Sequence, residues 1–141
     1  MNTQSTPHTV TKKTSRISIL LVEDDPVTAM MVKKVLDNQY MMHHATYGKE
    51  AIKLLHKYEF DLVLMDIDLD DVRGEEYLDG FDVLIYIREH PQLDALKVVA
   101  ITSNMRQALR ETYLAAGFNE YTQKPVTPQQ VLSLVETVLA A

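Results

Sequence analysis

Short apolar runs alternate with amphipathic segments five times along this chain of 141 residues. Ile17–Val22 and Leu62–Met65 are nearly continuous in apolar residues, which is typical of strands that are buried on both faces of a sheet. Shorter or weaker strands are predicted at 40–47, 98–101 and 119–122. The alternation therefore predicts an α/β fold, with a parallel sheet and helices on both of its faces.

Helix signals fill the segments between these strands. Asp25 followed by Pro26 is typical of a capping residue and the first turn of a helix. Further helices are predicted from Ala51 onward, in the segment that stops before Pro91, and over 105–116. The final helix is predicted from an apolar stripe at helical spacing: Val131, Leu134, Val135, Val138 and Leu139.

The chain length fits one domain with a substantial core. Residues 1–16 are polar and lack a hydrophobic period, so we predict a flexible leader there and one domain over 17–141. The leader lacks the apolar stretch of a secretory signal, and no apolar run is long enough to span a membrane. We therefore expect a cytoplasmic protein.

Composition excludes some kinds of site. The absence of cysteine excludes disulfides and thiolate metal sites. The net charge is −6, and the residues after the leader carry 11 basic and 20 acidic side chains, a net charge of −9. Such a surface repels a phosphate backbone, so nucleic acid is not an expected partner.

Polar clusters share one position, just after a predicted strand: Glu23-Asp24-Asp25, Asp66, Thr102-Ser103 and Lys124. In a parallel sheet these positions meet at the carboxyl edge, where ligands bind. Two carboxylates about 4 Å apart repel by about 4 kcal/mol at an effective dielectric of 20, so a grouped set needs a proton, a lysine or a divalent cation. Mg²⁺ prefers such oxygen ligands. With Lys124, this set suits phosphoryl transfer to an aspartate.

Four motifs, each after its predicted strand, resemble those of the response-regulator receiver domain of bacterial two-component signalling: Leu20-Leu21-Val22-Glu23-Asp24-Asp25-Pro26, Asp61-Leu62-Val63-Leu64-Met65-Asp66, Val98-Val99-Ala100-Ile101-Thr102-Ser103 and Tyr121-Thr122-Gln123-Lys124-Pro125. The resemblance covers residues 17–140. It implies a flavodoxin-like, doubly wound sheet with strand order 2-1-3-4-5, in a receiver of the stand-alone type.

The same resemblance assigns roles to individual residues: Asp66 as phosphoacceptor, Asp24 as a direct Mg²⁺ ligand, Glu23 as a ligand acting mainly through water, the backbone carbonyl of Asp68 as the third protein ligand, Lys124 as the cation that pairs with the phosphate, Thr102 as the switch hydroxyl and Tyr121 as the rotating aromatic. It also implies a cis bond before Pro125.

The implied function is a signalling switch that takes its phosphoryl group from a histidine kinase or a phosphotransfer protein. Only self-phosphorylation and self-dephosphorylation chemistry is expected, so the protein is not expected to be an enzyme. Output is expected through protein contact, at a surface formed by the fourth helix, the fifth strand and the fifth helix. A homodimer through that surface is a further association that the resemblance allows.

Two features depart from the family pattern. The acidic loop Ile67–Asp79 is about half a dozen residues longer than usual, and the matching glycine is Gly80. Asp68 and Asn104 flank the path of water to the phosphoryl group. An acid at position 68 is expected to alter the lifetime of the phosphorylated state, in a direction that the sequence leaves open.

Other interpretations compete with this one. The apolar strand followed by Asp66-x-Asp68 also resembles haloacid-dehalogenase-type phosphatases, but the further carboxylates that such enzymes carry after the lysine are missing. A receiver-like binding module that is never phosphorylated is the other alternative. A calcium loop from Asp66 fails because Asp71 and Tyr77 stand where glycine and glutamate are needed. Taken alone, Tyr121 fits static packing as well as it fits a switch.

Overall fold

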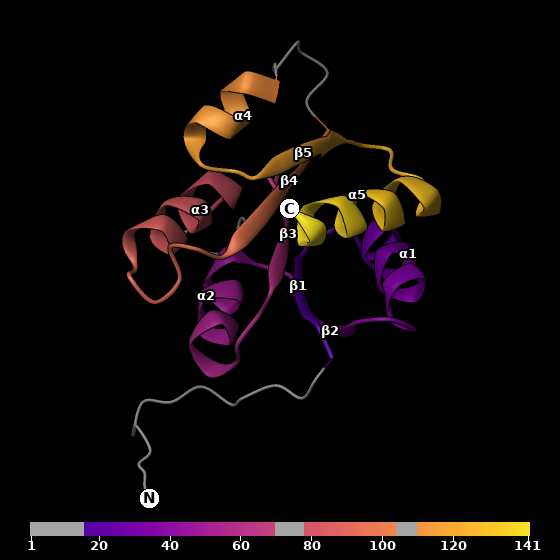
Figure 1. Cartoon of the computed structure of the whole chain (residues 1–141), viewed down its shortest axis with the longest axis horizontal. Coiled ribbons are helices and arrows are strands. Elements are labelled where there is room, and N and C mark those ends of the chain that lie inside the picture. Colours follow the sequence, from indigo (N-terminus) through magenta and orange to yellow (C-terminus); the bar gives the residue numbers. More distant parts are fainter. Residues whose placement is uncertain (1–15, 70–77, 104–109) are drawn as a thin grey trace, which may run out of the picture.

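Within residues 16–69, 78–103 and 110–141, which this computed structural model describes, five parallel strands form one sheet in the order β2-β1-β3-β4-β5 (Figure 1). The strands are β1 (Ser18–Val22), β2 (Met41–Ala45), β3 (Leu62–Asp66), β4 (Lys97–Thr102) and β5 (Glu120–Gln123). All five predicted strands and their predicted order are confirmed, with ends that differ by a few residues at most.

Helices cover both faces of this sheet: α1 (Pro26–Leu36), α2 (Gly48–Lys57), α3 (Gly80–Glu89), α4 (Arg110–Ala116) and α5 (Pro128–Ala140). Figure 1 shows α1 and α5 together on one face, with α2 and α3 on the other. The predicted helix over 105–116 is seen as α4 from Arg110, and 104–109 lie outside the described residues.

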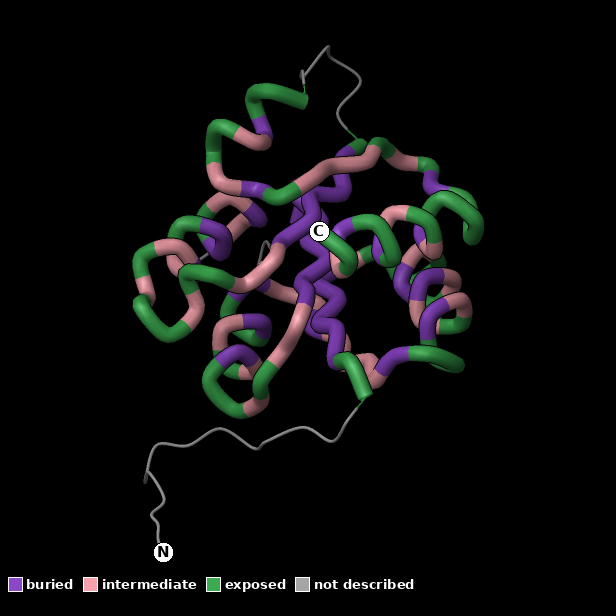
Figure 2. Tube along the Cα trace, viewed as in Figure 1, coloured by how far each residue is buried: buried purple, intermediate pink, exposed green. Residues whose placement is uncertain are grey.

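Successive strand residues point to opposite faces and build two separate cores. Leu20, Val63 and Met65 belong to the core beneath α2 and α3. Leu21 and Leu64 belong to the core beneath α1 and α5. Because both faces are covered, the central strands lose nearly all contact with water, and Figure 2 shows them as the buried centre of the molecule.

Helix caps fix where the helices nearest the site begin. Asp25 caps α1 by accepting a hydrogen bond from the Thr28 amide, as the sequence predicts. Asp79 forms a capping box with Asp82 and so fixes the start of α3 at Gly80. The acidic residues after β1 and the end of the long loop after β3 therefore have defined positions.

Gly80 lies directly behind the end of β3. A Cβ atom at this position would stand 2.6 Å from the Asp66 carbonyl oxygen and 2.9 Å from the Ile67 Cα, closer than packed atoms come. Only glycine lets α3 begin this close to the strand end. The two ends of the loop Ile67–Asp79 are thereby brought together, while its residues 70–77 lie outside the described parts of the chain.

Arg16, which the sequence analysis assigns to the leader, contacts the folded part of the chain. Residues 1–15 lie outside the described residues, so the predicted leader is not tested there. Arg16, the last residue of that leader, donates hydrogen bonds to the backbone carbonyls of Asp37 and Tyr40. None of the described helices is long and apolar enough to cross a membrane.

Candidate functional site

The carboxyl edge of the sheet brings four of the predicted polar positions together. Glu23 follows β1, Asp66 ends β3, Thr102 ends β4 and Lys124 follows β5. The backbone amide of Lys124 donates to the Thr102 carbonyl at 2.7 Å, which ties the chain after β5 to the end of β4. The Lys124–Pro125 bond is cis, as the resemblance implies.

Lys124 reaches both buried carboxylates of the site. Its Nζ lies 2.9 Å from Glu23 Oε2 and 3.4 Å from Asp66 Oδ2. The Glu23 side chain is 0% exposed and that of Asp66 is 1% exposed, so neither is hydrated as a surface carboxylate would be. One ammonium group therefore faces two buried acids, and no second ion pair to either acid is seen among the residues that the structure describes.

Oxygen atoms of Glu23, Asp24 and Asp66 all lie within 4.8 Å of one another. At that separation two like unit charges repel by about 3.5 kcal/mol at an effective dielectric of 20. Glu23 Oε1 is buried and has no hydrogen-bond partner among the described residues. An unsatisfied buried acceptor among close carboxylates is the arrangement that a divalent cation bound by oxygen would complete.

The ionisation of this cluster reflects its charge imbalance. Burial raises the pKa of the Asp66 carboxyl to about 8, and the neighbouring Glu23 carboxyl adds to that rise, while the Asp68 amide and Lys124 oppose it. Burial works against the charge of Lys124, but the hydrogen bond to Glu23 and the attraction of Asp66 outweigh it and raise the pKa of the lysine. Without a metal ion, a proton balances the two buried acids.

Asp68 connects Asp66 to the end of β4. Its backbone amide donates to Asp66 Oδ1 at 2.9 Å. Its carboxylate accepts two hydrogen bonds from Ser103, from the amide and from the hydroxyl, both at 2.8 Å. The sequence marked Asp68 as unusual but gave no signal for its pairing with Ser103, because the two residues belong to different loops.

Thr102 and Tyr121 occupy different environments. Thr102 is 1% exposed at the end of β4. Tyr121 is half-buried, and its ring stacks on Tyr113 of α4 with centroids 5.0 Å apart and an interplanar angle of 15°. Tyr113 in turn contacts Phe81 and Phe118, so the tyrosine of β5 joins an aromatic cluster that the sequence analysis missed.

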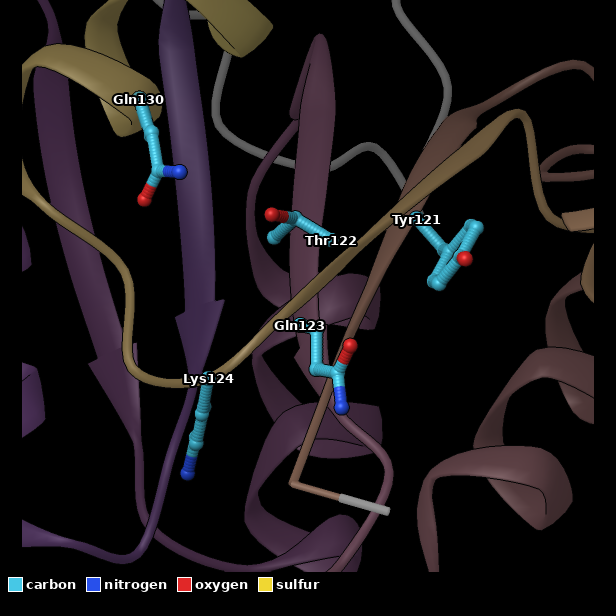
Figure 3. Close-up of a pocket in the computed structure, with 5 residues that line it drawn as sticks. All are labelled: Tyr121, Thr122, Gln123, Lys124 and Gln130. Atoms are coloured by element: carbon cyan, nitrogen blue, oxygen red, sulfur yellow. The ribbon is translucent and has the colours of Figure 1, made fainter. Parts of the chain in front are cut away.

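An open hollow of about 450 Å³ lies along β5 and ends at the lysine of the site. Its lining residues are Tyr121, Thr122, Gln123, Lys124 and Gln130. Figure 3 shows the side chains of Tyr121 and Thr122 projecting to opposite sides of the strand. The hollow is shallow and polar, unlike the enclosed apolar pockets that bind small molecules.

The two histidines of β2 have separate contacts. His44 Nε2 lies 2.8 Å from the Glu23 carbonyl, while His43 packs its ring against Tyr58 and Phe60. His44 therefore has a polar backbone partner, whereas His43 packs among aromatic rings.

Comparison with known proteins agrees with this geometry. The model of the family described as "Response regulator receiver domain" matches residues 19–136. An uncharacterized 14.6 kDa protein from the sodA1 3′ region of Leptolyngbya boryana is 31% identical over 86% of this chain and 89% of its own length. A CheY-like receiver domain protein from Methanospirillum hungatei has a crystal structure that is 25% identical, with a TM-score of 0.76, over 89% of this chain and 95% of its own.

The signal transduction histidine-protein kinase BarA of Escherichia coli also matches, with 26% identity over 84% of this chain but only 12% of the kinase. The similarity there is confined to one part of a much longer protein. The family match covers most of the chain, and the strand order and the acidic edge agree with it. This chain belongs to the response-regulator receiver domain family.

Proposed function

We propose that this signalling switch accepts its phosphoryl group on Asp66, from a phosphohistidine of a histidine kinase or a phosphotransfer protein. The supporting observation is the buried Asp66 carboxylate at the end of the central strand β3, 3.4 Å from the Lys124 ammonium and grouped with two further acids. A carboxylate oxygen of Asp66 attacks phosphorus as the phosphorus–nitrogen bond breaks. The electron pair of that bond stays on the imidazole nitrogen, which takes up a proton from solvent.

Mg²⁺ is the cation that suits the acidic cluster. Asp24, Asp66 and the backbone carbonyl of Asp68 would hold it directly, with Glu23 acting mainly through water. When bound, it neutralises charge on the transferred group. Lys124 supplies the second positive charge, because its ammonium already lies between Glu23 and Asp66. The buried, unpartnered Oε1 of Glu23 supports a cation here over a set of unpaired surface acids.

Thr102 and Tyr121 form the readout. The Thr102 hydroxyl moves to hydrogen-bond the phosphoryl oxygens, and Tyr121 follows by giving up part of its stack on Tyr113. Phosphorylation then shifts the population toward a state that a partner protein recognises at α4, β5 and α5. The same surface is where a homodimer would form. Residues 17–141 act as the folded unit in this scheme.

Phosphorylation is tested with acetyl phosphate or phosphoramidate and Mg²⁺, followed by intact-protein mass spectrometry. Wild type gains one phosphoryl group, and Asp66→Asn gains none. Asp37→Asn is the matched control, because it removes an exposed carboxylate just after α1. If folded wild type gains no phosphoryl group from small donors or from a phosphorylated kinase, the proposal is wrong. Turnover of phosphate esters would instead favour the phosphatase alternative.

A further inference from the structure

The Asp68 carboxylate occupies two hydrogen-bond donors beside the phosphoacceptor. Ser103 offers its amide and its hydroxyl from the position directly after Thr102, and both are bonded to Asp68 Oδ2 at 2.8 Å. The Asp68 amide is itself bonded to Asp66 Oδ1. A short span of backbone therefore connects the phosphoacceptor oxygen to a carboxylate held by two donors at the end of β4.

These donors suit an anion. A backbone amide and a hydroxyl converging on one oxygen are typical of sites that bind phosphate or carboxylate. A phosphoryl group on Asp66 brings three oxygens that require donors. Among the described residues, Lys124 lies 3.4 Å from Asp66, and Thr102 and Ser103 follow Ile101, the residue of β4 that pairs with Asp66. Lys124 already serves two carboxylates, so Ser103 is a further donor on which the new oxygens can draw.

We infer that Asp68 is an internal competitor of the phosphoryl group: its carboxylate holds Ser103 in the unphosphorylated state and releases it when Asp66 is phosphorylated. This inference rests on the proposed function. Asp68 acts as a positioning residue, because it works through Ser103 and undergoes no bond change itself.

This competition for Ser103 predicts the direction in which Asp68 changes phosphorylation. Its negative charge repels the incoming group, and its two hydrogen bonds must break before Ser103 can turn to a phosphoryl oxygen. Asp68 therefore slows phosphorylation and weakens the phosphorylated state. Both Asp68 and Ser103 are exposed, so solvent screens part of this penalty. We expect an effect of roughly three- to tenfold on affinity, as for one or two hydrogen bonds to a charged group at the surface.

The direct test measures beryllofluoride binding with Mg²⁺ by fluorine NMR, in wild type, Asp68→Ala and Asp68→Asn. We expect Asp68→Ala to bind the phosphoryl analogue roughly three- to tenfold more tightly than wild type, with Asp68→Asn between them because its neutral amide oxygen can still accept from Ser103. Asp94→Ala, which removes an equal charge from the exposed segment between α3 and β4, should leave the affinity unchanged.

A second readout is the hydrogen exchange of the Ser103 amide, measured first without metal or analogue and then with both. The Ser103 amide should exchange with solvent several-fold faster in Asp68→Ala than in wild type, and addition of beryllofluoride should restore its protection. Equal or weaker analogue binding in both Asp68 variants overturns the inference, as does an unchanged Ser103 exchange rate. If folded wild type and all variants fail to bind the analogue or gain a phosphoryl group, the proposed function fails and the inference falls with it.

Discussion

The acidic edge of the sheet should bind a proton or a magnesium ion, but not both at once. Burial and the adjacent Glu23 raise the pKa of Asp66 to about 8 when no metal ion is present. At pH 7, about nine-tenths of the molecules therefore carry a proton on this pair of acids. Because a carboxylate must be deprotonated to ligate a metal, Mg²⁺ must displace that proton.

The cost of this displacement follows from the pKa. Each pH unit below 8 adds about 1.4 kcal/mol to the free energy of releasing one proton, so the apparent Kd for Mg²⁺ should rise about tenfold per unit. Between pH 7.5 and pH 6.5 the expected change is roughly eightfold, because a quarter of the molecules are already deprotonated at the higher value. Above about pH 8.5 the apparent Kd should become constant.

Isothermal titration with Mg²⁺ at pH 6.5, 7.5 and 8.5 measures both affinity and proton release, if each titration is repeated in two buffers of different ionisation enthalpy. Close to one proton should leave per Mg²⁺ at pH 6.5 and only about a quarter of a proton at pH 8.5. In Asp66→Asn, residual Mg²⁺ binding should lose most of this pH dependence. An apparent Kd that is equal at pH 6.5 and 8.5 in wild type would refute the reasoning.

Three further outcomes are expected. In EDTA, the protonated Asp66 carboxyl stabilises the fold fully below its unfolded pKa of about 4, and this contribution is lost as pH rises through about 8. The loss is at most about 1.4 kcal/mol per pH unit. In urea titrations, wild type should therefore lose more unfolding free energy across that pH range than Asp66→Asn. Tyr113→Ala should lower the unfolding free energy by about 3 kcal/mol, because it removes a buried ring and its stack on Tyr121. Tyr113→Phe keeps the ring and should cost under about 1 kcal/mol. Equal losses of unfolding free energy in urea titrations of the two variants would contradict this packing. Gly80→Ala should lower the unfolding free energy by about 1–3 kcal/mol and weaken Mg²⁺ binding, because the added methyl group meets the Asp66 carbonyl. A thermal melt and a Mg²⁺ titration identical to those of wild type would argue against that contact.

The strands and the principal site were predictable from the sequence because their signals are local. Apolar runs that end in acids mark strands on their own, and the carboxyl edge of a parallel sheet collects the residues that follow them. Asp25 and Pro26 likewise predict the start of α1 without reference to the rest of the chain. Glu23, Asp66 and Lys124 meet as expected, although 101 positions separate the first from the last.

Pairings between irregular segments were not predictable in this way. The contact of Asp68 with Ser103 depends on how two loops turn after their strands, and no periodicity describes that turn. Helical spacing places Tyr113 within α4, but the face that it presents to Tyr121 depends on how α4 packs beside β5. The contacts that the sequence missed are therefore those that depend on packing between elements.

The contact of Gly80 with the end of β3 also fixes the point at which the loop Ile67–Asp79 ends. The chain leaves the sheet at Ile67 and returns at Gly80 to nearly the same point, so the core fixes both ends of this loop. Lengthening such a loop costs little, about 0.6 kcal/mol for each doubling. The loop beyond Asp68 can thus change in length without moving Asp66, which leaves a place beside the acidic edge where the sequence can diverge.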